Sequence, residues 1–192
     1  PRQRDGMVDR WQRAVASAVD LVQRRTMESD GGRHLSTLAQ DTQEWLEEHG
    51  FSVRDPLLWR EALTHGSTGL ARDYDRLEFL GDRVLGLSIA DWLYNQSNDA
   101  EGKLAQRLNA LVSKGACAKV ARQLGLSDHV LLGKQARDDG AAGSDNILGD
   151  VMEALLGAQF LEAGFDSARA LVRRHWHDDV RGDAGHSKHP KS

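Results

Sequence analysis

Two acidic residues lie in a stretch whose other residues are typical of a buried helix. Glu78 and Asp82 are four residues apart within residues 75–87, so on a helix they share one stripe. Asp75 lies one turn earlier on nearly the same line. The stripe continues into apolar residues and the opposite side is also apolar, which predicts a helix enclosed by the rest of the protein. Carboxylates in such a position need a compensating charge.

A second stretch has the same character. Residues 147–158 are apolar on nearly all sides of a helix, and Asp150 and Glu153 are three residues apart, which places them about 60° from each other. Gly157 lies close to the stripe of these acids, where the absence of a side chain would let another helix approach closely. Two enclosed helices that each carry a pair of carboxylates can therefore converge on one site.

Two explanations for these acids stay open at this point. One is a core network in which an Arg side chain or a helix N-terminus satisfies each carboxylate. The other is a divalent cation, because two like charges about 4 Å apart repel by roughly 4 kcal/mol at an effective dielectric constant of about 20. No Lys or Arg lies on the stripe of Glu78 and Asp82 to offset this repulsion. Ligands that are all oxygens favour Mg²⁺, with Mn²⁺ as a substitute, over Zn²⁺.

Both stretches resemble signature sequences of the ribonuclease III family. Residues 75–82, DRLEFLGD, are similar to the family's signature, and residues 147–157, ILGDVMEALLG, to its second acidic helix. Further similar segments lie, in the family's order and spacing, at residues 62–67, 111–113 and 121–126. The resemblance covers about residues 40–178.

This resemblance implies an all-α endonuclease domain that works as a homodimer, with one acidic site per protomer beside a cleft for double-stranded RNA. It implies Mg²⁺-dependent hydrolysis that leaves 5′-phosphate and 3′-hydroxyl ends, in RNA processing such as maturation of ribosomal RNA precursors. The acids expected as catalytic metal ligands are Glu78, Asp82, Asp150 and Glu153. Phe79 matches the aromatic residue of the family's dimer interface, although its periodicity alone would make it a core residue.

A row of basic residues is a candidate for RNA contact. Lys103, Arg107 and Lys114 are predicted to lie on one face of a helix that opens at Glu101, where they could follow a phosphate backbone. An ordinary solvated helix face explains the row equally well. By resemblance, Glu101 is expected near the RNA at the dimer interface.

Two further candidates for RNA contact depart from the family's pattern. Asp75 stands where the family commonly has Glu, and its shorter side chain is expected to bind metal through water or to contact RNA. His65 is followed by Gly66, where the family usually has Arg. A contact made by that Arg must be lost or supplied elsewhere, and His65 alone is more typical of a structural hydrogen-bonding residue.

The chain is predicted to have three parts. Residues 1–35 form an extension with an amphipathic helix at residues 8–25 and a linker, residues 36–180 the endonuclease domain, and residues 181–192 a flexible polar tail. The tail looks like the segment that, in the family, leads to a double-stranded-RNA-binding domain. No strand-like alternation of apolar and polar residues interrupts this all-α pattern.

Local signals predict several helix ends. Gly50 ends the helix that follows Leu35, and Asp55 with Pro56 begins the next one. The chain is predicted to turn at residues 163–166, which include Gly164, and the last helix is predicted at about residues 167–177, with Asp166 as its N-cap.

Bulk composition is that of a globular protein with no membrane partner. The 192 residues are 40% hydrophobic and 28% charged, with a net charge of −4, and no apolar run approaches the roughly 20 residues of a membrane span. The single cysteine, Cys117, is expected to be a small packing residue in a reducing compartment. With no secretory signal in view, the cytoplasm is the expected location.

Two other functions compete with the nuclease. A catalytically silent RNA-binding protein of the same fold is one, and the presence of all four acids argues against it. A carboxylate-bridged di-metal oxidase is the other, but that class needs Glu-x-x-His pairs, and the sequence contains none.

Overall fold

The structure is a computed structural model that describes residues 37–186. The helix predicted at residues 8–25 lies outside the described residues. Within residues 37–186 there are helices and no strand, and Thr64 and Leu131 form an isolated parallel bridge. The prediction of an all-α domain is therefore confirmed.

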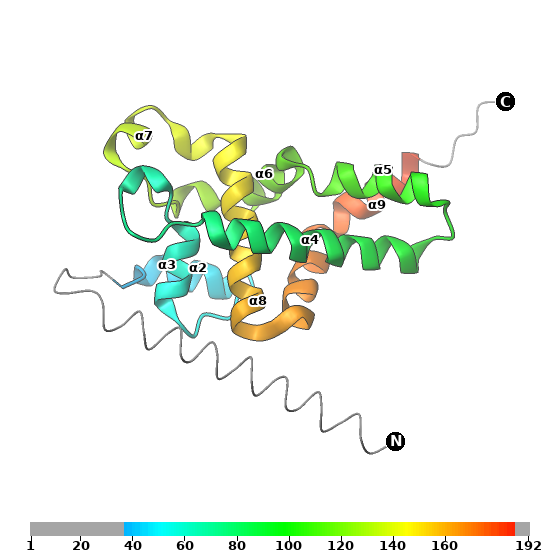
Figure 1. Cartoon of the computed structure of the whole chain (residues 1–192), viewed down its shortest axis with the longest axis horizontal. Helices are drawn as coiled ribbons and strands as arrows, with labels where there is room; N and C mark the ends of the chain where they lie inside the picture. The colour runs from blue at the N-terminus through cyan, green and yellow to red at the C-terminus, as the bar shows by residue number, and fades with distance from the viewer. Residues whose placement is uncertain (1–36, 187–192) are drawn as a thin grey trace, which may run out of the picture. The chain divides into compact units, whose positions relative to one another are not determined.

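The structure has two long helices, α4 and α8, and several shorter ones (Figure 1). The α-helices are α2 (Gln40–Glu48), α3 (Pro56–Leu63), α4 (Asp75–Gln96), α5 (Glu101–Leu111), α6 (Lys114–Gln123), α7 (Lys134–Asp138), α8 (Asp145–His175) and α9 (His177–His186). Short 3-10 turns lie at Gly66–Thr68, Leu126–Asp128 and Ala141–Gly143. The first half of α8 crosses α4, and α6 packs against α8 (Figure 1).

Three predicted helix boundaries or turns occur where the sequence places them. Gly50 follows α2 with a φ of 91°, a left-handed conformation that suits glycine. Asp55 caps α3 by accepting a hydrogen bond of 3.0 Å from the backbone N–H of Leu57, with Pro56 as the first helical residue. Gly164, with a φ of 82° and a ψ of 175°, interrupts α8, and Figure 1 shows the chain turning back at this point.

The end of the chain differs from the prediction. Asp166 pairs with Arg169 over 2.9 Å, and the helical segment after Gly164 ends at His175. A further helix, α9, then runs to His186, beyond the predicted end of the last helix and into the segment expected to be a flexible tail.

Burial of two apolar side chains explains why the helical structure continues there. Trp176 and Val180 are completely buried, and the indole N–H of Trp176 donates a hydrogen bond of 3.0 Å to the carbonyl oxygen of Leu111 at the end of α5. The charged residues around Trp176 and Val180 conceal this apolar pair in the sequence.

The contact between α4 and α8 depends on glycine in both helices. A Cβ atom at Gly81 would overlap the carbonyl oxygen of Glu153, and one at Gly157 would overlap the carbonyl oxygen of Leu77. The two backbones therefore touch directly. The close approach predicted at Gly157 is confirmed, and it brings the acidic side chains of both helices to one place.

The two acidic helices differ in how far they are enclosed. In α8, residues 147–159 are buried except for the half-buried Asp150, as predicted. The prediction that α4 is enclosed is wrong for one side of the helix, where Phe79 is 66% and Leu87 58% exposed. This open face of α4 also carries Arg83, whose guanidinium lies 5.0 Å from the centre of the Phe79 ring. No helix within residues 37–186 combines the length and the apolarity that crossing a membrane requires.

Candidate metal centre

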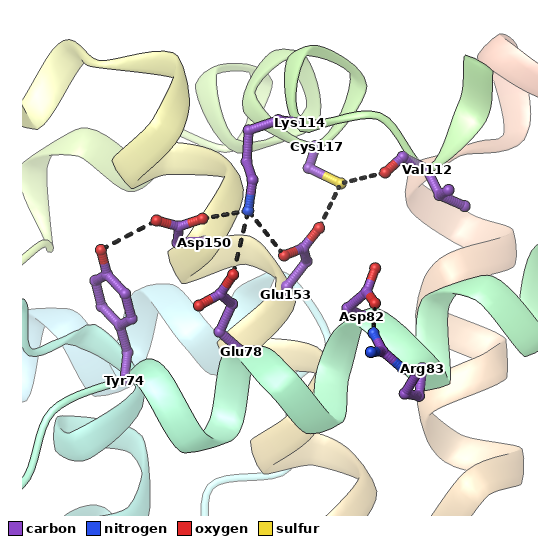
Figure 2. Close-up of polar contacts among 9 residues, drawn as sticks. All are labelled: Tyr74, Glu78, Asp82, Arg83, Val112, Lys114, Cys117, Asp150 and Glu153. Carbon is purple, nitrogen blue, oxygen red and sulfur yellow. Dashed lines mark hydrogen bonds and ion pairs between the residues drawn. The ribbon is translucent and has the colours of Figure 1, made fainter. Parts of the chain in front are cut away.

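Three carboxylates from α4 and α8 meet in one cluster (Figure 2). Glu78 comes from α4, and Asp150 and Glu153 come from consecutive turns of α8. One oxygen of each side chain lies within 4.8 Å of the others. Burial increases across this acidic cluster: the side chain of Glu78 is 32% exposed, that of Asp150 21% and that of Glu153 4%.

Asp82, the fourth predicted ligand, lies outside this cluster. It sits one turn after Glu78 on α4, and its carboxylate pairs with Arg83 (Figure 2). Asp82 and Arg83 nevertheless line the same surface pocket as Glu78 and Glu153. The side chain of Asp82 is 38% exposed. Its carboxylate is therefore close to the acidic cluster but is turned toward a different cation.

A lysine from a third helix supplies the positive charge that the stripe of acids lacks. The Lys114 ammonium lies 3.3 Å from Glu78 Oε1 and 3.1 Å from Glu153 Oε2, and it also donates a hydrogen bond to Asp150 Oδ1. Figure 2 shows it between the three side chains. This arrangement differs from the core network considered from the sequence, in which an Arg or a helix N-terminus satisfies each acid: here one lysine is shared by three acids.

The predicted row of basic residues on one helix is wrong. The helix that carries Lys103 and Arg107 ends at Leu111, and Lys114 is the first residue of α6, with Ser113 as its N-cap. Ser113 accepts a hydrogen bond of 3.2 Å from the backbone N–H of Ala116, which is the local reason why a new helix begins there. A serine directly before Lys114 is the sequence signal that would have placed the lysine correctly.

Arg107 has a structural position. Its side chain is 9% exposed, lies 3.6 Å from Asp99 and donates to the side-chain oxygen of Gln96 over 3.5 Å, so it supports the turn between α4 and α5. Lys103 also pairs with Asp99, over 2.9 Å, but its side chain is 45% exposed. The hydrogen bond from Lys103 lowers the pKa of Asp99. Of the predicted row, only Lys103 remains on the surface of α5.

The other RNA-contact candidates lie outside the acidic cluster. Glu101 and Asp75 are exposed in the first turns of α5 and α4, where the helix dipole favours negative charge. His65 is half-buried, and its Nδ1 accepts a hydrogen bond of 3.1 Å from the backbone N–H of Ser67. RNA contact by these three residues stays a prediction.

Two uncharged donors that the sequence analysis did not assign to the site fix the acids of α8. The hydroxyl of the buried Tyr74 donates to Asp150 Oδ2 over 3.3 Å, and the thiol of Cys117 lies 3.6 Å from Glu153 Oε1. Asp150 and Glu153 thus each have one oxygen held by a neutral donor and the other turned toward Lys114. Cys117 is buried, as expected of a packing residue, and nothing in the sequence distinguishes Tyr74 as a donor to Asp150.

Burial and charge act against each other at this site. Burial raises the pKa of Glu153, and the neighbouring Lys114 opposes that rise. Burial alone would lower the pKa of Lys114, but its hydrogen bond to Asp150 and the charge of Glu153 outweigh this effect and raise it. Burial also raises the pKa of Cys117 and that of Tyr74, so both stay protonated donors at neutral pH. An adjacent cation therefore favours the ionised form of Glu153.

The residues present suit a hard divalent cation. All three ligands are carboxylates, the type that Mg²⁺ and Mn²⁺ prefer, and their oxygens already face one point. The ammonium of Lys114 marks that point as a place where a cation is stable. Asp82 could add a fourth oxygen if its side chain turned away from Arg83.

Comparison with known proteins gives consistent matches to one family. A family model described as Ribonuclease-III-like matches residues 55–180. The chain is 55% identical over 150 residues to a protein named Ribonuclease 3 from Zymomonas mobilis, a match that covers 77% of this chain and 61% of the relative. It is 43% identical over 158 residues to Ribonuclease 3 from Rhodobacter capsulatus, with 81% and 69% covered. The chain therefore spans about three fifths of the length of the Zymomonas relative.

Two solved structures of the nuclease domain of ribonuclease III from Campylobacter jejuni are also similar. One superposes with a TM-score of 0.70 at 34% identity, covering 73% of this chain and 97% of that one. The other has a TM-score of 0.69 at 34% identity and covers 72% and 98%; it concerns structural flexibility in the region involved in dimer formation. The similarity thus extends over nearly the whole of that nuclease domain.

Proposed function

The chain belongs to the ribonuclease-III-like family, and from this premise we propose that it is an Mg²⁺-dependent endonuclease that hydrolyses double-stranded RNA. The observation that carries the proposal is the acidic cluster of Glu78, Asp150 and Glu153, held together by two helices in backbone contact. Relatives named Ribonuclease 3 from two bacteria support the same activity.

In the proposed mechanism, the acidic cluster would hold the cation, with Mn²⁺ as a substitute for Mg²⁺. When bound, the ion would supply a water of lowered pKa and stabilise negative charge on the phosphate and the leaving oxygen. Tyr74 and Cys117 occupy one oxygen each of Asp150 and Glu153, so that the other oxygen of each carboxylate would be the one that binds the ion. Asp82, on the same pocket, would complete the set after leaving Arg83.

The proposed substrate is recognised by shape. The major groove of A-form RNA is too narrow for side chains to read, so contacts to phosphates and 2′-hydroxyls across the minor groove dominate, and sequence specificity is weak. The products would carry 5′-phosphate and 3′-hydroxyl ends, in processing such as maturation of ribosomal RNA precursors in the cytoplasm. Exposed side chains available for such contacts include Glu101, Lys103 and Asp75.

A homodimer is part of the proposal. The open face of α4 exposes Phe79 and Leu87, two large apolar side chains that a second copy would cover. The similar nuclease domain from Campylobacter jejuni has a region involved in dimer formation.

The position of the Lys114 ammonium within the acidic cluster favours a second candidate function. Because its ammonium already occupies the centre of the acidic cluster and offsets part of its charge, the chain could be a catalytically silent protein that binds duplex RNA without cutting it.

The deciding experiment is incubation of an end-labelled RNA duplex with the chain in Mg²⁺ at low salt. The wild type is expected to cut, and Glu153→Gln, which keeps the shape of the side chain without its charge, is expected to be inactive. Glu44→Gln, an exposed residue on α2, is the matched control and should cut like the wild type. Equal cleavage by wild type and Glu153→Gln would rule out the site assignment, and binding without cleavage by the wild type would favour the silent protein.

A further inference from the structure

We propose that Lys114 is a built-in competitor for the divalent cation: its ammonium offsets part of the negative charge of the acidic cluster in the metal-free protein and has to leave before a metal ion can bind. This inference rests on the metal site of the proposed function. According to this inference, the side chain of Lys114 on α6 determines the metal concentration at which the site becomes occupied.

The competition follows from where the ammonium lies. Lys114 Nζ is 3.3 Å from Glu78 Oε1 and 3.1 Å from Glu153 Oε2 and is bonded to Asp150, so it occupies the centre of the cluster (Figure 2). A Mg²⁺ ion would lie about 2.1 Å from each ligand oxygen. An ion bonded to these same oxygens would therefore overlap the ammonium, and the two cations exclude each other.

The protein makes room for the lysine in this position. A Cβ atom at Gly149 on α8 would overlap the side chain of Lys114, so the glycine provides the space through which the aliphatic part of the lysine passes. Lys114 is also the first residue of α6, where the helix dipole disfavours a positive charge. The lysine does not serve the stability of α6 there, and the contacts that stabilise its charge are those with the acidic cluster.

The ammonium has a way out of the cluster. The side chain of Lys114 is 36% exposed and lines the surface pocket together with Phe79 and Arg83. Four rotatable bonds separate its ammonium from the backbone, so the charge can move to solvent while α6 stays in place. Displacement requires a rotamer change and no movement of a helix.

The exchange of cations has two consequences. In the metal-free protein, the lysine offsets the repulsion between three carboxylates, one of which is Glu153 with a side chain that is only 4% exposed. On metal binding, part of the attraction for the ion is used to break the contacts of Lys114. Removing the charge of Lys114 should therefore strengthen metal binding and destabilise the metal-free fold.

The test measures Mn²⁺ binding by isothermal titration calorimetry on the metal-free chain, without RNA. Lys114→Met keeps the length of the side chain and removes its charge. We expect it to bind Mn²⁺ roughly tenfold more tightly than the wild type, and to melt at a lower temperature in EDTA. Lys119→Met is the matched control, because Lys119 lies on the same helix and pairs with Asp179 of α9 instead of the acidic cluster. It should bind Mn²⁺ like the wild type.

The outcomes separate this inference from the proposed function. If Glu153→Gln abolishes Mn²⁺ binding but Lys114→Met binds as the wild type does or more weakly, the competitor role is overturned and the metal site stands. If wild type and Glu153→Gln bind Mn²⁺ equally, or neither binds it, the acidic cluster is not the metal site and both proposals fail.

If Lys114→Met does not fold, a measurement on the wild type alone tests whether the metal ion displaces Lys114. The chain is treated briefly with an amine-acetylating reagent, in EDTA or in Mn²⁺, and the modification of each lysine is read by peptide mass spectrometry. Lys114 should be acetylated several-fold faster in Mn²⁺, with Lys119 unchanged. Equal acetylation of Lys114 in both conditions would show that the metal does not displace it.

Discussion

At the scale of single residues, the site depends on which groups contact each carboxylate oxygen of Asp150 and Glu153. Tyr74 holds Oδ2 of Asp150 and Cys117 lies beside Oε1 of Glu153, and both donors stay uncharged because burial raises the pKa of each. The other oxygen of each carboxylate, Oδ1 of Asp150 and Oε2 of Glu153, faces the ammonium of Lys114. Neutral groups thus orient a cluster of like charges, and the ammonium of Lys114 offsets part of that charge.

Tyr74→Phe tests this orientation. Loss of the hydroxyl frees Asp150 to rotate, so we expect the Mg²⁺ concentration for half-maximal cleavage to rise, and the free energy of unfolding to fall by about 1 kcal/mol, the value of one hydrogen bond. Cleavage rates across a Mg²⁺ series and urea unfolding measure the two effects. Tyr94→Phe, on a side chain that is 75% exposed, is the control. An unchanged Mg²⁺ dependence of Tyr74→Phe would show that the phenol does not position Asp150.

At this scale the sequence predicted the acids better than their partners. Glu78, Asp150 and Glu153 were identified because a charge in an apolar helical stripe conflicts with burial, and the conflict is visible in a single stretch. Lys114 reaches them from α6, and which helix packs there is a property of the fold. The pairing of Asp82 with Arg83 depends on side-chain rotation, which periodicity does not describe.

At the scale of elements, the contact of α4 with α8 sets the distances in the site. Glycine at positions 81 and 157 lets the backbones touch, and this contact brings Glu78 within reach of the two acids of α8. The sequence predicted both helices and the close approach at Gly157. It missed the break between α5 and α6, because basic residues continue at helical spacing across Ser113.

Gly81→Ala should separate the two helices. A Cβ atom there would overlap the carbonyl oxygen of Glu153, which is backbone and cannot turn away, so we expect urea unfolding to show a loss of about 3 kcal/mol or more. Gly86→Ala on the same helix is the control, because a Cβ atom meets no atom within 4 Å there. Alanine at this position should increase the free energy of unfolding by roughly 0.5–1 kcal/mol. Similar stability of the two variants would contradict direct backbone contact.

At the scale of the whole molecule, the open face of α4 is the largest difference between expectation and structure. The sequence predicts that its apolar residues are enclosed, because a sequence shows that a face is apolar but does not show whether the same chain covers it. The resemblance to the family assigns Phe79 to a dimer interface, and the exposure of that side chain fits this assignment.

The proposed dimer gives a prediction for Phe79→Ala. Because Phe79 is 66% exposed in the single chain, the substitution should hardly change the stability of a protomer, whereas loss of an aromatic anchor should weaken association by 2 kcal/mol or more, on the order of thirtyfold. Sedimentation over a concentration series measures this. Leu161→Ala, also at an exposed apolar residue, should associate like the wild type. A wild-type chain that stays monomeric at all concentrations would contradict the dimer.

The central claim is that Glu78, Asp150 and Glu153 hold a divalent metal ion, and the most direct test is anomalous diffraction from a crystal soaked in Mn²⁺. We predict one strong anomalous peak per chain, bonded to oxygens of these three side chains, with the Lys114 ammonium withdrawn toward the surface pocket. An acidic cluster without a peak at millimolar Mn²⁺, with Lys114 still bonded to its three carboxylates, would contradict the account.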